Sequence, residues 1–169
     1  MSLPDNENIK AVCQYLFPAT MLAANCGVKI QTILGSCVSV CLYDPANKVG
    51  GMNHFMLPFW NGDGLESPKF GNVAMDMLLT KLIQLGADKA SLQAKVFGGA
   101  NQYTYSKNAF NIGEQNIQLA LYALEQFNIP VVASSVGGVY GRKILFESAS
   151  GQVLMKYITP KNPERKALL

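Results

Sequence analysis

Two short apolar segments flank a turn-forming sequence, and this arrangement constrains the fold more than any other feature of the chain. The segments are residues 37–43 and 50–57, and residues 44–49 between them read Asp-Pro-Ala-Asn-Lys-Val. Apolar runs of this length, bounded by Asp, Pro and Asn, are typical of strands joined by a tight turn. The sequence therefore predicts a β-hairpin over residues 37–57.

The turn residues also predict which side chains face each other across the hairpin. Asp and Pro favour the first two positions of a type I turn, so Asp44 closes on Asn47 and Cys37 lies directly opposite His54. Directly opposed side chains have Cβ atoms about 4.5–5.5 Å apart, within reach of a sulfur to imidazole hydrogen bond. A loop two residues longer makes His54 a diagonal neighbour on the same face, whereas a change of one residue separates the faces.

Cys37 and His54 form a candidate nucleophile and base. A thiol attacks carbonyl groups as the thiolate, and a free cysteine, with a pKa of about 8.5, needs a base or a cation beside it at neutral pH. His54 is the single histidine of the chain. The alternative is structural, because free cysteines are among the most buried residues and a lone histidine in a strand is often satisfied by the main chain.

The residues before Cys37 favour the catalytic interpretation. Gly35 and Ser36 form a small, flexible turn whose main-chain N–H groups can point at a substrate carbonyl and hold an oxyanion. Thr32, on a predicted strand over residues 28–34, is the nearest upstream polar side chain that can orient the imidazole. Its alternative role is that of a β-branched residue filling a strand.

Several motifs in order carry a resemblance to a known family. They lie in residues 32–45, 50–58, 96–101, 111–116 and 136–143. Together they resemble the signature of the CheD family, the chemoreceptor glutamine deamidases of bacterial chemotaxis, over about residues 20–158. One departure is visible, because the family usually has an acidic residue just before the Val-Gly-Gly motif, where this chain has Ser134 and Ser135.

The resemblance implies a Cys-His-Thr triad that converts glutamine side chains of methyl-accepting chemoreceptors into glutamate and ammonia, with some receptor methylesterase activity. By motif position the triad falls on Cys37, His54 and Thr32. The resemblance also implies pairing with a CheC-type phosphatase that acts on CheY-phosphate. Tight glycine turns bring the main chain close to the mouth of such a site, and the candidate substrate contacts are Phe55, Gly98, Gly99, Gly137 and Gly138.

The rest of the chain predicts a layered scaffold. A helix is expected from a cap at Ser67 and Pro68 to about Leu85, and a second from a cap at Asn111 to Asn128. Further strands are expected at residues 92–97, 131–136, 142–147 and 152–158. We therefore expect an α/β single-domain layered sandwich, with mixed or antiparallel sheets and two main helices packed outside.

Composition fits one domain that buries a real core. The 169 residues are 49% hydrophobic with a net charge of +3. We expect a catalytic domain over residues 1–158 and a disordered tail over 159–169, where two prolines and scattered charges lie. No basic leader precedes an apolar run, so we expect a cytoplasmic protein without membrane insertion. The modest charge and the lack of interleaved aromatic residues argue against nucleic-acid binding.

The four cysteines predict neither a metal site nor a disulfide. Cys37 and Cys41 lie about 13 Å apart along one strand, and the chain has no C-x-x-C spacing. We expect Cys13, Cys26 and Cys41 to be reduced, packed thiols, and no cofactor. Two other functions share these features, namely a regulator that acts mainly by binding the phosphatase, and a cysteine hydrolase of small amides or esters.

Overall fold

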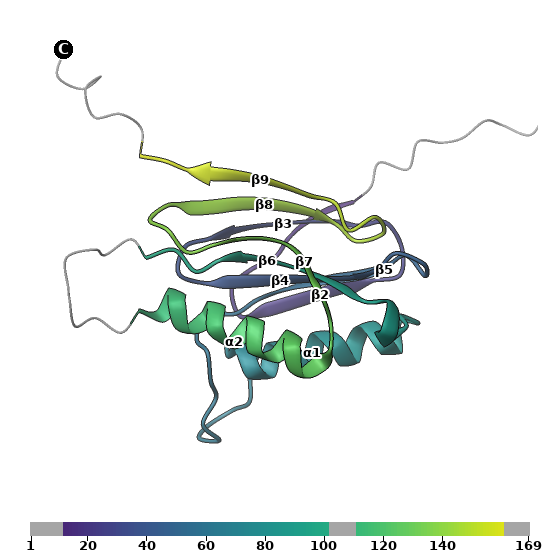
Figure 1. Cartoon of the computed structure of the whole chain (residues 1–169), viewed down its shortest axis with the longest axis horizontal. Helices are drawn as coiled ribbons and strands as arrows, with labels where there is room; N and C mark the ends of the chain where they lie inside the picture. Colours follow the sequence, from purple (N-terminus) through teal and green to yellow (C-terminus); the bar gives the residue numbers. More distant parts are fainter. Residues whose placement is uncertain (1–11, 102–110, 161–169) are drawn as a thin grey trace, which may run out of the picture.

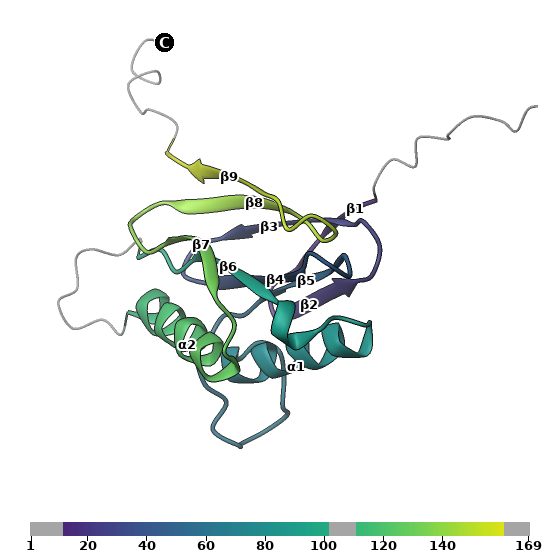
Figure 2. The ribbon, with the colours of Figure 1, turned by 45° about the vertical axis from the view of Figure 1, so that its right-hand side comes forward.

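Two β-sheets and two helices form three stacked layers (Figure 1). The computed structural model describes residues 12–101 and 111–160. Both helices, α1 (Gly71–Gln84) and α2 (Ile112–Phe127), cover the outer side of one sheet, and the second sheet covers its inner side (Figures 1 and 2). The four-stranded sheet has the order β1 (Cys13–Tyr15), β3 (Lys29–Leu34), β8 (Gly141–Glu147) and β9 (Val153–Ile158). The five-stranded sheet has the order β2 (Thr20–Ala24), β5 (Val49–His54), β4 (Val38–Asp44), β6 (Gln93–Gly98) and β7 (Val131–Val136).

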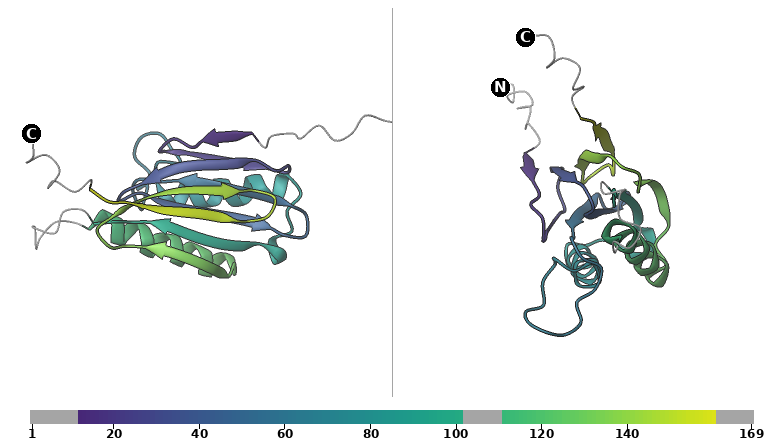
Figure 3. Two further views of the ribbon diagram at one scale, coloured as in Figure 1. Left: turned by 90° about the horizontal axis from the view of Figure 1, so that it is seen from above. Right: turned by 90° about the vertical axis from the view of Figure 1, so that its left-hand side faces the viewer.

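Both sheets are mixed. The β1–β3 and β6–β7 pairs are parallel, and the other neighbouring strands are antiparallel. Seen from above, the four-stranded sheet lies over the five-stranded one (Figure 3). The predicted α/β layered sandwich with two outer helices is confirmed.

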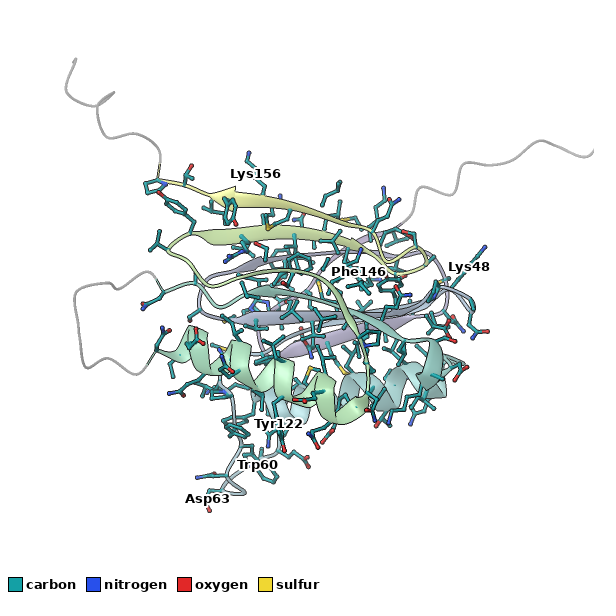
Figure 4. All side chains as sticks on the ribbon, in the orientation of Figure 1. Lys48, Trp60, Asp63, Tyr122, Phe146 and Lys156 are labelled. Atoms are coloured by element: carbon teal, nitrogen blue, oxygen red, sulfur yellow. The ribbon has the colours of Figure 1, made fainter. Side chains whose placement is uncertain are left out.

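Strand β4 is the centre of the molecule because it contributes to two hydrophobic cores. All seven of its residues are buried. Val40 and Leu42 face the helices in the first core, whereas Cys41 and Tyr43 face the four-stranded sheet in the second. Phe146, labelled in Figure 4, belongs to this second core. The alternation follows from the pleat of a strand with both faces covered.

The predicted hairpin exists, but its predicted register is wrong by two residues. Asp44 pairs with Val49 and Cys41 with Met52, so the loop has four residues instead of two. An isolated bridge between Val38 and Phe55 continues the same register. The longer loop was the alternative that keeps the nucleophile and the histidine on one face, so their shared face is confirmed.

The Asp44 side chain explains the longer loop. One carboxylate oxygen accepts hydrogen bonds from the N–H groups of Ala46 and Asn47, at 2.9 and 3.1 Å. Lys48 then adopts the left-handed conformation, with φ 55°, and returns the chain to β5. Four-residue hairpin loops are commonly built around a type I turn, so Asp44 and Pro45 correctly indicated the position of the turn. They did not indicate that the loop is two residues longer than the turn alone.

Helix α1 begins at Gly71, later than predicted, and the predicted cap at Ser67 is wrong. Its N-cap is Phe70, in extended conformation and without a side-chain hydrogen bond. The N–H groups of Gly71 and Asn72 donate instead to the carbonyls of Leu57 and Pro58, at 2.7 and 3.1 Å. Main-chain acceptors from a distant segment thus replace the side-chain cap.

Helix α2 agrees with its predicted ends. Asn111 accepts a hydrogen bond from the N–H of Glu114 at 3.0 Å, as a capping side chain does. Asn128 ends the helix in the left-handed conformation, with φ 57°. This helix runs alongside α1, and its first turns lie near the end of β4 that carries the nucleophile.

Two strands escaped prediction, and the prediction of packed thiols is wrong for two cysteines. Strands β1 and β2 precede the predicted scaffold, and β2 reads Thr-Met-Leu-Ala-Ala, a sequence with little strand propensity. All four cysteines are free, but Cys13 and Cys26 are exposed and only Cys41 is packed as predicted. The predicted tail falls mostly in residues 161–169, which lie outside the described residues.

Neither a membrane-spanning helix nor a metal cluster occurs in the described part of the chain. None of its helices has the length and hydropathy needed to cross a bilayer. Residues 12–101 and 111–160 also contain no group of three His, Cys, Asp or Glu side chains placed to hold a metal ion.

Candidate active site

Cys37 lies in a turn at the entrance to β4, and the scaffold holds this turn by its carbonyl groups. The carbonyl of Gly35 accepts from the N–H of Ala100, and that of Cys37 from the N–H of Gly99, both at 2.8 Å. Between them, the Ser36 carbonyl accepts from the side-chain amide of Asn116 at 3.0 Å. Three successive carbonyls are therefore fixed by groups outside the turn.

The N–H groups of Ser36 and Cys37 remain available. Within residues 12–101 and 111–160, neither donates a hydrogen bond to another residue. The N–H of Cys37 interacts with its own thiol and acts to lower the pKa of that thiol. Two free donors beside a half-buried nucleophile are the arrangement that an oxyanion hole needs.

His54, the last residue of β5, lies diagonally across from Cys37. In the register set by the bridge between Val38 and Phe55, Ser39 lies directly opposite His54. The side chains of Cys37, Ser39 and His54 therefore share the face that looks toward the four-stranded sheet. The imidazole is 1% exposed. It is thus a buried base at the end of the space between the two sheets.

Thr32 reaches the imidazole from the opposite sheet. Its Oγ1 lies 2.8 Å from Nδ1 of His54 and donates to the carbonyl of Leu16 at 2.7 Å. The hydroxyl has one hydrogen and the carbonyl can only accept, so Oγ1 must accept the second hydrogen bond from Nδ1–H. The proton of the neutral imidazole is therefore on Nδ1, and Nε2 carries the lone pair that a base requires.

Burial keeps both reacting groups neutral at rest. Desolvation lowers the pKa of His54 to about 4, although the Leu16 main chain acts in the opposite direction. Desolvation also raises the pKa of the Cys37 thiol above its ordinary value, and its own N–H offsets this only in part. At neutral pH the site therefore holds a thiol and an imidazole, not a thiolate and an imidazolium.

Three buried side-chain atoms without a hydrogen-bond partner lie around this turn. They are Ser39 Oγ, His54 Nε2 and Asn116 Oδ1, and they are the complete set among the described residues. Buried polar atoms are normally paired, so unpaired ones mark strain, a ligand or a catalytic role. Their concentration at Cys37 independently indicates a functional site.

The glycines predicted as substrate contacts are neighbours of the nucleophile turn. A Cβ on Gly98, where φ is 109°, would lie 2.2 Å from the Cys37 carbonyl oxygen. Gly99 donates to that oxygen, and the N–H of Gly137 donates to the Gly98 carbonyl at 2.9 Å. Close packing accounts for Gly98 and Gly99, whereas Gly137 and Gly138 have room for a Cβ and are distinguished by their positive φ angles of 72° and 73°. Contact of these four glycines with a substrate stays a prediction.

The predicted contact at Phe55 is restricted by burial. Its side chain is 0% exposed and belongs to the first core, where it packs near Gly71 of α1. The N–H and the carbonyl of Phe55 are both hydrogen-bonded to Val38, so contact of this residue with a substrate stays a prediction.

Sequence reasoning missed Asn116 and Arg142. Asn116 is a fully buried polar residue on the helix stripe that carries Gly113, Ile117 and Ala120, and a polar residue in such a stripe could have been noticed. Likewise Arg142, 2% exposed, is a charged residue on the same face of β8 as the buried Ile144.

Among the described residues, the hydrogen-bond partners of Arg142 are neutral, and one of them is Ser135, at the place where the family resemblance led us to expect an acidic residue. Its Nε donates to Ser135 Oγ at 3.0 Å, and its other nitrogens donate to main-chain carbonyls, including that of Gly137 at 2.8 Å. Its guanidinium also lies 5.2 Å from the ring centroid of Tyr157. In the described part of the chain no carboxylate pairs with this buried cation.

The chain is similar to a known family of proteins. Residues 56–157 match the family model described as CheD chemotactic sensory transduction, a match that begins two residues after His54. A probable chemoreceptor glutamine deamidase CheD from Trichlorobacter lovleyi is 50% identical over 141 residues, covering 83% of this chain and 88% of the relative. A protein of the same name from Sulfurimonas denitrificans is 44% identical over 146 residues, covering 86% and 94%.

One solved structure is also similar. The Bacillus licheniformis hypothetical protein YfiH has a TM-score of 0.45 and 17% identity, covering 70% of this chain and 51% of that protein.

Proposed function

The chain belongs to the CheD family of chemotactic sensory transduction proteins, and from this membership we propose that it hydrolyses glutamine side-chain amides of chemoreceptors. Cys37 is the nucleophile, His54 the base and Thr32 the residue that orients the imidazole. One observation carries the proposal: the hydrogen bond from His54 Nδ1 to Thr32 leaves Nε2 unprotonated and without a partner. The half-buried thiol lies on the same face of the sheet.

The first step forms a thioester and releases ammonia. Nε2 of His54 takes the thiol proton while the sulfur of Cys37 attacks the amide carbon. The carbonyl electrons move to the oxygen, where the N–H groups of Ser36 and Cys37 stabilise the charge. The imidazolium then protonates the leaving nitrogen, the carbon–nitrogen bond breaks, and ammonia departs.

The second step returns the enzyme to its resting state. A water molecule gives a proton to Nε2 as its oxygen attacks the thioester carbon. The carbon–sulfur bond breaks, glutamate leaves, and the sulfur recovers its proton from the imidazolium. The Nδ1–H bond to Thr32 keeps the ring in one orientation through both steps.

The neutral resting pair supports general-base catalysis over a preformed ion pair. With the pKa of His54 lowered to about 4 and that of the Cys37 thiol raised, an ion pair is disfavoured before substrate binds. The thiolate then forms only as the sulfur attacks. Ser36 is exposed beside Cys37 at the end of the sheet, which suits a glutamine presented by a folded protein.

Related activities follow from the same chemistry and family. The thiol would also cleave methyl esters of receptor glutamates, since an ester and an amide give the same acyl intermediate. The family resemblance implies a CheC-type phosphatase as a second partner, and we place the protein in the cytoplasm with its catalytic unit within residues 1–158. These parts of the proposal rest on the family and not on the site geometry.

The test is peptide mass mapping of a cytoplasmic chemoreceptor fragment after incubation with the wild type, Cys37→Ala or Cys26→Ala. The expected result is conversion of particular glutamines to glutamates, with ammonia release, by the wild type and by Cys26→Ala. Cys26 is free and exposed like an ordinary surface thiol, so it serves as the matched control. Cys37→Ala should fold normally and convert none.

Two other results would contradict the proposal. Conversion by Cys37→Ala would remove the cysteine mechanism. A folded wild type that converts no glutamine in its cognate receptor would favour the alternative of a regulator that acts by binding the phosphatase.

A further inference from the structure

Asn116 connects helix α2 to the turn that carries the nucleophile. Its side chain, fully buried on α2, donates one hydrogen bond to the Ser36 carbonyl and one to the Met56 carbonyl, each at 3.0 Å. Met56 lies opposite Cys37 in the hairpin register. One amide thus ties together the two segments that carry the nucleophile and the base.

The orientation of this amide is fixed by its partners. Both neighbours are carbonyl oxygens, which can only accept, so the nitrogen of Asn116 must face them. Its own Oδ1 is buried and has no hydrogen-bond partner among the described residues. Burying an unpaired acceptor is unfavourable, so stability alone does not explain an asparagine at this site.

The hydrogen bond from Asn116 to the Ser36 carbonyl also determines the direction of the Cys37 N–H. The Ser36 carbonyl and the Cys37 N–H belong to one peptide group, and in a trans peptide the two point in opposite directions. Holding the carbonyl against α2 therefore aims the Cys37 N–H away from α2, toward the open side of the turn. The preceding peptide is held in the same way, through the hydrogen bond from Ala100 to Gly35.

We propose that Asn116 is a positioning residue that pre-orients the Cys37 N–H as an oxyanion donor. This inference rests on the proposed amide hydrolysis and extends it from the triad to the helix behind the turn. Of the two groups that hold these peptides, only Asn116 is a side chain, so it is the one that substitution can remove. Without it the Ser36–Cys37 peptide can rotate about its two flanking single bonds, ψ of Ser36 and φ of Cys37.

An oxyanion donor acts in the transition state and not in substrate binding, which defines the test. Asn116→Leu and Asn116→Asp have nearly the same shape and both lack the amide donors. We expect kcat for deamidation to fall about 100-fold, with KM changed little. Asn111→Asp on the same helix keeps an acceptor for the Glu114 N–H and should retain wild-type kinetics.

A second readout separates positioning from a general loss of structure. Because the Cys37 N–H also acts to lower the pKa of its own thiol, turning this N–H away in Asn116→Leu should raise the pH at which iodoacetamide alkylates Cys37. Peptide mapping should show alkylation of the exposed Cys26 as in the wild type and no alkylation of the buried Cys41, which reports that the variant is folded. If Asn116→Asp fails to fold because its carboxylate is buried, Asn116→Leu carries the comparison.

The inference is wrong if kcat stays at the wild-type value, if the pH profile of Cys37 alkylation is unchanged, or if the loss of kcat is accompanied by alkylation of the buried Cys41. These results differ from failure of the proposed function, in which the wild type itself releases no ammonia.

Discussion

At the scale of single residues, the hydroxyl of Thr32 determines what His54 can do. It accepts from Nδ1–H because its own hydrogen is donated to Leu16. We predict that Thr32→Val, which keeps the shape but not the oxygen, lowers kcat about 10- to 100-fold by releasing the imidazole to other tautomers and orientations. Thr32→Ser should stay within a few-fold of the wild type. Ammonia release from a receptor fragment measures both, and equal activity of the valine and serine variants would show that the hydroxyl is not used.

The buried imidazole also predicts a pH dependence of stability. The unfolded chain binds a proton near the ordinary pKa of 6.5, whereas the folded protein does so only near 4, so protonation favours unfolding. The stabilisation is complete above pH 6.5 and is lost as the pH falls toward 4. From pH 7 to 5 we expect the free energy of unfolding to fall by about 2 kcal/mol through this group. Measured by urea unfolding, the free energy of unfolding should fall between pH 7 and 5 by about 2 kcal/mol more for the wild type than for His54→Gln. An equal fall in the two proteins would contradict the prediction.

The residues of the candidate triad were easy to nominate because few alternatives existed. The chain has one histidine, one cysteine after a Gly-Ser turn and a threonine on the preceding strand, and alternation along the hairpin put Cys37 and His54 on one face. Asn116 was not predictable as a functional residue. Its role depends on where α2 docks against the Ser36 turn, and that contact spans 80 positions in the sequence.

At the scale of elements, β7 and β8 are linked by Arg142, whose positive charge has no carboxylate partner among the described residues. The Arg142 guanidinium donates to Ser135 Oγ, a neutral acceptor. We predict that Ser135→Asp stabilises the protein by about 1 kcal/mol, because an ion pair replaces a hydrogen bond from the guanidinium to a neutral hydroxyl. Ser134→Asp adds the same charge on the same strand, at an exposed residue, and should have no such effect. Thermal unfolding of both variants tests this, and equal melting temperatures would refute it.

Element boundaries were harder to predict than element types, for reasons visible at two ends. The hairpin loop depends on Lys48 taking a left-handed conformation, which its residue type does not signal. The start of α1 depends on the carbonyls of Leu57 and Pro58, which lie more than ten residues upstream. Local sequence therefore located each element but not its first residue.

At the scale of the whole molecule, the candidate triad spans both sheets. Thr32 belongs to the four-stranded sheet, whereas His54 belongs to the five-stranded one and Cys37 precedes its central strand. The second core, which packs the sheets together, therefore sets the distance between the threonine and the imidazole. Packing between the layers is part of the catalytic arrangement.

This arrangement predicts that cavities in the two cores have different effects on activity. Ile144→Ala in the second core and Leu78→Ala in the first should each cost about 2–5 kcal/mol of stability. At a temperature where both variants are fully folded, we expect kcat to fall about 10-fold only for Ile144→Ala, because a small displacement of Thr32 misplaces the base. Equal kcat values for the two variants would mean that the sheets hold the site without this core.

The layered architecture followed from the predicted elements, but one edge strand of each sheet did not. Strand β1 has three exposed residues and β2 is rich in alanine, so neither carries the alternating pattern of a half-buried strand. Their pairing comes from β3 and β5, against which they dock. The sequence therefore predicted the layers and the edge strands β7 and β9, but not the opposite edge strands β1 and β2.

The neutral resting thiol of Cys37 also affects how the protein withstands oxidants. Peroxides attack thiolates far faster than thiols, and burial raises the pKa of this thiol. In the proposed mechanism the sulfur becomes nucleophilic only when a substrate is in place and the imidazole takes its proton. We therefore expect peroxide to oxidise Cys37 more slowly than the cysteine of an enzyme with a permanent thiolate, so the arrangement favours chemical durability.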